Sequence, residues 1–105
     1  MENNTKNFLQ YFTIISGVKN KDKYINLLLE HNANVVETIY GKSSVNKSFL
    51  AQAFGFDNET KKVVITCLVP EFKAKELIEI LKTEYNFGKP NTGIAFSTRV
   101  EGLLF

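Results

Sequence analysis

Blocks of apolar residues along the chain predict four β-strands. Residues 8–16 (FLQYFTIIS) are rich in aromatic and β-branched residues and are followed by a glycine, which indicates a strand. Residues 35–40 (VVETIY), also followed by a glycine, and residues 63–69 (VVITCLV) have the same composition. Residues 94–100 (IAFSTRV) alternate large apolar residues with smaller or polar ones, which predicts a half-buried fourth strand.

Two segments between these strands have apolar residues at helical spacing. The first begins at Asn20-Lys21-Asp22, where a short polar side chain can accept from free backbone N–H groups, and it ends at Asn32-Ala33-Asn34. Its apolar stripe consists of Tyr24, Ile25, Leu27, Leu28 and Leu29. The second begins near Pro70, which stops the preceding strand. Its buried face is predicted to contain Ala74, Leu77, Ile78 and Leu81.

The order β-α-β-β-α-β predicts an α+β, ferredoxin-like sandwich, with an antiparallel sheet and both helices on one face. In the strand 63–69, Val63, Ile65, Cys67 and Val69 point to one face of the sheet, and Val64, Thr66 and Leu68 point to the other. The helices can cover only one of these apolar faces. This second face is expected to be covered by self-association, with burial under the terminal segments as the alternative. Residues 49–56 fit either a strand or a helical turn, between a polar loop and a turn signal at 57–60.

The chain has 105 residues and a net charge of +2. This predicts one domain, over residues 8–105, after a disordered lead-in at residues 1–7. The charge is too small to predict nucleic-acid or anionic-membrane binding. No apolar run is long enough to span a bilayer and no signal peptide is evident, so a cytoplasmic location is expected.

The titratable side chains do not indicate an enzyme, because no nucleophile–base pair and no paired carboxylates occur at a useful spacing. A single Cys and a single His exclude a disulfide framework or a Cys/His metal cluster within one chain. His31 is expected at a helix end, where the dipole favours a cation, and Cys67 inside a strand.

Three stretches resemble the PII signalling proteins and their PII-like relatives. VVETIYG (35–41) resembles the family's second strand, which ends in glycine where the long T-loop begins. KKVVITCLVP (61–70) resembles the family's lysine, third strand and proline. GKPNTGIAF (88–96) is similar to the B-loop pattern G-K-x-G-D-G-K-I-F. Together these stretches indicate a PII-like regulatory protein related to the nitrogen regulatory P-II family.

The resemblance implies a homotrimer that binds a nucleotide between subunits. The B-loop positions match Gly88, Lys89, Asn91, Thr92 and Gly93, where glycines would let backbone amides approach an anion. Lys62 matches the family's phosphate-contacting lysine, with a solvated turn charge as the alternative. The root of the T-loop is matched by Gly41 and Ser43. For Gly93 the alternative is a role in the turn alone.

Departures from the family pattern change the expected ligand. Ile94 replaces the second B-loop lysine, and the two arginines after the last strand have no counterpart. Fewer cations favour AMP, ADP or a cyclic nucleotide over magnesium ATP with 2-oxoglutarate; an empty, degenerate site is the alternative. Residues 42–56 contain no tyrosine, which excludes the family's T-loop tyrosine modification there.

By this resemblance, the protein regulates a partner protein through its T-loop, with a membrane transporter as the expected class of partner. Two other functions compete with it. A ferredoxin-like nucleic-acid binder would stack bases on exposed sheet aromatics, although the low charge disfavours it. A trimeric metal-tolerance protein similar to the CutA family would need ligands from several chains.

Overall fold

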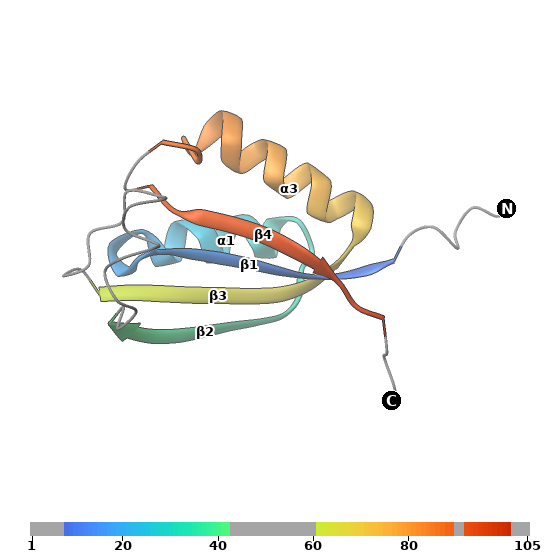
Figure 1. The fold of residues 1–105 in the computed structure, drawn as a ribbon, viewed down its shortest axis with the longest axis horizontal. Helices are drawn as coiled ribbons and strands as arrows, with labels where there is room; N and C mark the ends of the chain where they lie inside the picture. Colours follow the sequence, from blue (N-terminus) through green and yellow to red (C-terminus); the bar gives the residue numbers. More distant parts are fainter. Residues whose placement is uncertain (1–7, 43–60, 90–91, 102–105) are drawn as a thin grey trace, which may run out of the picture.

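The computed structural model describes residues 8–42, 61–89 and 92–101. Its elements follow the predicted β-α-β-β-α-β order, with one short 3₁₀ turn before the first helix (Figure 1). They are β1 (Leu9–Gly17), the 3₁₀ turn η2 (Val18–Asn20), α1 (Lys21–Glu30), β2 (Asn34–Lys42), β3 (Lys61–Pro70), α3 (Glu71–Glu84) and β4 (Ile94–Arg99).

The four strands form one antiparallel sheet in the order β2-β3-β1-β4. Each helix therefore links two strands that have one other strand between them. Figure 1 shows α1 and α3 on the same side of the sheet, as right-handed crossover connections require when both pack on one face. The α+β, ferredoxin-like prediction is confirmed.

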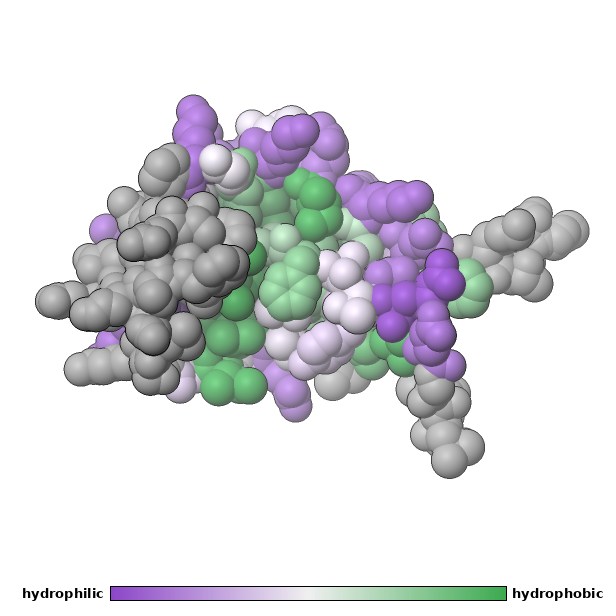
Figure 2. Space-filling model, viewed as in Figure 1, coloured by the Kyte–Doolittle hydropathy of each residue, from purple (hydrophilic) through white to green (hydrophobic). Residues whose placement is uncertain are grey.

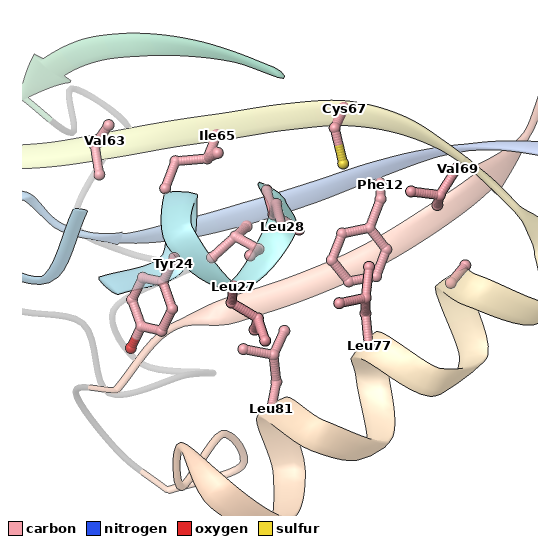
Figure 3. Close-up of a cluster of buried hydrophobic side chains, with 12 residues drawn as sticks. Phe12, Tyr24, Leu27, Leu28, Val63, Ile65, Cys67, Val69, Leu77 and Leu81 are labelled. Carbon is pink, nitrogen blue, oxygen red and sulfur yellow. The ribbon is translucent and has the colours of Figure 1, made fainter. Parts of the chain in front are cut away.

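The hydrophobic core lies between the sheet and the two helices (Figure 3). The strands contribute alternate residues, which is why these side chains share one face. The fully or almost fully buried core side chains are Phe12, Ile14, Tyr24, Leu27, Leu28, Val63, Ile65, Cys67, Val69, Ala74, Leu77 and Leu81. The prediction that Ile78 is buried is wrong, because it is 36% exposed. In the stripe of α1, Leu29 is 54% exposed. A helix buries a limited arc of its surface, and these two residues lie outside it.

The sequence predicted the C-terminus of α1 correctly but not the capping of its N-terminus. Asn20 makes no side-chain capping bond, contrary to expectation. The 3₁₀ turn leads directly into the helix, and the Lys21 N–H donates to the Val18 carbonyl. The predicted C-terminus is confirmed: Asn32 has φ of 59°, and its N–H donates to the Leu29 carbonyl at 3.0 Å. Asparagine tolerates this left-handed conformation better than most residues.

The opposite face of the sheet is not covered by either helix (Figures 1 and 2). Thr13 and Thr66 face each other across β1 and β3 at its centre, and each is only 4% exposed. Around them, Tyr11, Ile39 and Phe96 are exposed apolar residues. Figure 2 shows apolar surface across the middle of this face. The predicted second face thus exists, and the trimer that would cover it stays a prediction.

Some predictions lie outside the described residues. These are the lead-in at 1–7, the polar loop with the ambiguous segment 49–56, and the turn at 57–60. The division into a lead-in and one domain therefore stays a prediction. Within the described ranges, neither helix combines the length and the apolar character needed to cross a membrane.

Candidate functional site

The strand termini bring the matched residues to one end of the sheet. β2 ends, β3 begins, β1 ends and β4 begins there, at the left of Figure 1. The register places Gly41 beside Lys62, and Lys62 beside Gly17 on its other side. The register of the sheet thus brings Gly41 and Lys62 next to each other.

Lys62 is a strand residue, and the solvated-turn alternative is wrong. It belongs to β3 and is only 8% exposed, whereas the preceding Lys61 is exposed. Alternation along β3 places it on the sheet face away from the helices. The residues paired directly with it on both sides are glycines, which carry no side chain to lie beside its aliphatic stem. A lysine ammonium is a compact charge that can contact a phosphate, and Lys62 places one in this row of the sheet.

The second group of matched residues forms a turn between α3 and β4. We call its described residues, Gly88, Lys89, Thr92 and Gly93, the glycine turn; Asn91 lies outside the described residues, as does Ser43. Gly88 has φ of +104° and open space at its Cβ position. A glycine is favoured there because other residues rarely adopt this conformation.

The glycine turn and Lys62 lie at the same end of the sheet but on strands that are not adjacent. Ile94, which follows the turn, pairs with Ile15 of β1, and β1 lies between β4 and β3. Two strand spacings separate the backbones of β4 and β3 by about 10 Å. We call Lys62 and the glycine turn the two candidate half-sites of the chain.

An apolar pocket of about 210 Å³ adjoins the glycine turn. α3 contributes Ile78, Leu81 and Lys82, and the turn with the start of β4 contributes Phe87, Gly88, Gly93, Ile94 and Ala95. This explains the exposure of Ile78, since it lines the pocket instead of packing against the sheet.

Comparison with solved structures finds this architecture in PII-like proteins. CPII from Thiomonas intermedia K12, in a structure bound to ADP, AMP and acetate, matches with a TM-score of 0.66 at 17% sequence identity. That match covers 88% of this chain and 85% of CPII. The apo form of CPII matches with a TM-score of 0.65 at 18% identity, over 88% of each chain. A PII-like signalling protein from Thermus thermophilus matches with a TM-score of 0.64 at 16% identity, over 88% of this chain and 85% of that one.

The chain has the PII-like fold. The resemblance drawn from three short stretches is thereby confirmed at the level of the fold. No protein-family model matches the sequence, and no curated protein matches it either.

Sequence reasoning missed one cation at the same end of the sheet. Lys21 begins α1, and its ammonium nitrogen lies 5.5 Å from the centre of the Tyr40 ring in β2. Contacts with the Tyr40 hydroxyl and, to a lesser degree, with Asp22 raise the pKa of Lys21. The sequence did contain a hint, because Lys21 lies in the first turn of a helix, where the helix dipole disfavours a cation. A lysine there is expected to contact a side chain of another element, as Lys21 does with Tyr40.

His31 and Cys67 lie where the sequence placed them. His31 caps the C-terminus of α1, with its Nδ1 3.9 Å from the carboxylate of Glu76 in α3. Cys67 is buried, and burial raises its pKa to about 11. Among the described residues, no three His, Cys, Asp or Glu side chains gather into a group that could hold a metal ion.

Proposed function

We propose that this PII-like chain is a regulatory protein that binds an adenine nucleotide at the end of its sheet. The observation that carries the proposal is the Gly41–Lys62–Gly17 row beside the glycine turn, on a fold shared with CPII. Two structures of CPII are bound to ADP and AMP. In this chain Lys62 supplies a cation for a phosphate, and the glycine turn supplies backbone N–H groups.

The two half-sites support binding between subunits of a homotrimer. A nucleotide that uses Lys62 of one copy and the glycine turn of another requires assembly. The uncovered sheet face, with Tyr11, Ile39 and Phe96 exposed, supplies apolar area for that assembly. Ser43 and Asn91 complete the proposed site, together with Gly41, Lys62, Gly88, Lys89, Thr92 and Gly93.

The charge of the site favours a ligand with few phosphates. Ile94 occupies the position at which the family has a second phosphate-contacting lysine. Lys62, which matches the other family lysine, lies within strand β3. We therefore propose AMP, ADP or a cyclic nucleotide as the ligand, in preference to magnesium ATP with 2-oxoglutarate.

The proposed output is a partner protein, with a membrane transporter as the class suggested by the resemblance. The chain between Gly41 and Lys62 begins and ends in the same row of the sheet. A ligand phosphate at this row would contact the root of that segment, and a contact made in only one of its states would shift its population.

A thermal-shift screen with AMP, ADP, ATP and cyclic AMP tests the nucleotide, because a ligand that binds the folded state raises the melting temperature. Calorimetry then gives affinity and stoichiometry, for which we expect one nucleotide per chain. Light scattering in the same buffer tests the trimer. The absence of any shift at millimolar nucleotide would refute the proposal.

A second candidate function has one observation in its favour. Tyr11 is 43% exposed and Phe96 is 45% exposed on adjacent strands of the uncovered face, where a nucleic-acid binder would stack bases. Glu37 lies on the same face, and its charge opposes a phosphate backbone. Fluorescence anisotropy with a labelled single-stranded RNA separates the two functions, and we expect no saturable binding.

A further inference from the structure

The two glycines that flank the turn are glycines for different reasons. Gly88 has a positive φ and open space around it, so its backbone conformation accounts for the residue type. Gly93 has no positive φ. A Cβ atom there would instead lie 2.7 Å from Cζ and 2.9 Å from Cε2 of Phe87. Carbon atoms do not approach that closely, so a side chain at position 93 would require the ring of Phe87 to shift.

Phe87 is held from two further sides. Its backbone N–H donates to the Leu81 carbonyl at 3.0 Å, which fixes it to the end of α3. Its ring meets the ring of Tyr24 edge to face, with centroids 5.5 Å apart. Tyr24 is 1% exposed and belongs to the core, so Phe87 joins the glycine turn to α1 as well as to α3.

Gly93, just before β4, has close neighbours on two sides. The Phe87 ring lies on one side of Gly93, and the Ile15 carbonyl oxygen lies 3.0 Å from the Cβ position on the other. Ile15 belongs to β1, whose position the whole sheet determines. The ring and the pairing with β1 together limit where the backbone returns from the turn into the sheet.

We propose that Phe87 is a positioning residue for the anion-binding conformation of the glycine turn, and that Gly93 is a glycine because it accommodates this ring. This inference rests on the proposed function, since it assigns the turn a phosphate to bind. It differs from an explanation in which Gly93 is a glycine so that a phosphate can approach its backbone. The two explanations make opposite predictions for a second substitution at position 87.

The test compares Gly93→Ala in two backgrounds. Phe87→Leu keeps an apolar side chain and removes the two ring atoms that would meet a Cβ at position 93. Four proteins are needed: the wild type, G93A, F87L and F87L/G93A. For each, calorimetry measures ADP affinity, thermal unfolding measures melting temperature, and hydrogen exchange measures protection of the amides from Thr92 to Ala95.

In the wild-type background, Gly93→Ala is expected to weaken ADP binding at least about tenfold, because an overpacked contact moves the turn. In the F87L background the loss from the same substitution is expected to be smaller, about threefold. The ring contacts are gone there, and only the Ile15 carbonyl oxygen, 3.0 Å from the Cβ position, still opposes the new methyl group. Gly88→Ala is the matched control. Its effect should be equal in both backgrounds, because its glycine is needed for backbone conformation.

Equal losses from Gly93→Ala in both backgrounds would overturn the inference, because they would show that the ligand and not the ring requires the glycine. Unchanged affinity and unchanged protection in F87L and G93A alone would overturn it too. If the wild type binds no nucleotide, the proposed function fails and the ligand role of Phe87 fails with it. The fit of the ring to Gly93 then stands or falls on melting temperature and hydrogen exchange.

Discussion

Removing the charge of Lys62 tests the proposed phosphate contact directly. Lys62→Met keeps most of the aliphatic stem, which lies in β3 between two glycines and is only 8% exposed. The substitution therefore removes an ammonium group with little loss of packing. The matched control is Lys61→Met, one residue earlier and exposed.

The expected size follows from the kind of contact. A hydrogen bond between a charged donor and a charged acceptor contributes about 1.5–3 kcal/mol, which corresponds to about a 10- to 150-fold increase in the Kd for ADP. Lys61 would contribute only a screened attraction across solvent, so K61M is expected to change the Kd less than about threefold.

Calorimetry at low and at physiological salt is the assay, with light scattering to confirm that both variants assemble as the wild type does. The difference between K62M and K61M should persist at higher salt, because a buried pair is screened less than an exposed one. Equal ADP affinities in K62M and K61M would refute the assignment of Lys62 as a phosphate ligand.

Three further predictions concern the rest of the molecule. The thiol of Cys67, with a pKa raised to about 11 by burial, should react with a disulfide reagent at pH 8 only after unfolding; rapid labelling of the folded protein would contradict its burial. Leu77→Ala, at a side chain with no exposure, should lower the free energy of unfolding in urea by about 2–5 kcal/mol, whereas Lys75→Ala should change it by less than about 0.5 kcal/mol. Phe96→Asp on the uncovered sheet face should yield an 11.9 kDa monomer by light scattering, and Phe72→Asp on α3, equally hydrophobic and 58% exposed, should not; assembly that survives F96D would place the subunit interface elsewhere.

The elements and their order were predictable because they depend on local patterns. Alternation in residues 63–69 reports a strand with one face in the core, and the spacing of Ala74, Leu77 and Leu81 reports a helix with one buried stripe. Asn32 ended its helix as expected, since the tolerance of asparagine for positive φ is a property of one residue. From these local features the ferredoxin-like arrangement follows with few alternatives.

The site depended on contacts between residues far apart in the chain. The sequence left Lys62 as either a ligand or a turn charge, and the register that places it between Gly17 and Gly41 decided that it is a buried strand residue. Register is a property of paired strands, and no single segment contains it. The sequence likewise offered two reasons for Gly93, a turn or an anion site, and neither named Phe87. That ring lies against Gly93 because α3, α1 and β1 pack together around it, which only the assembled core determines.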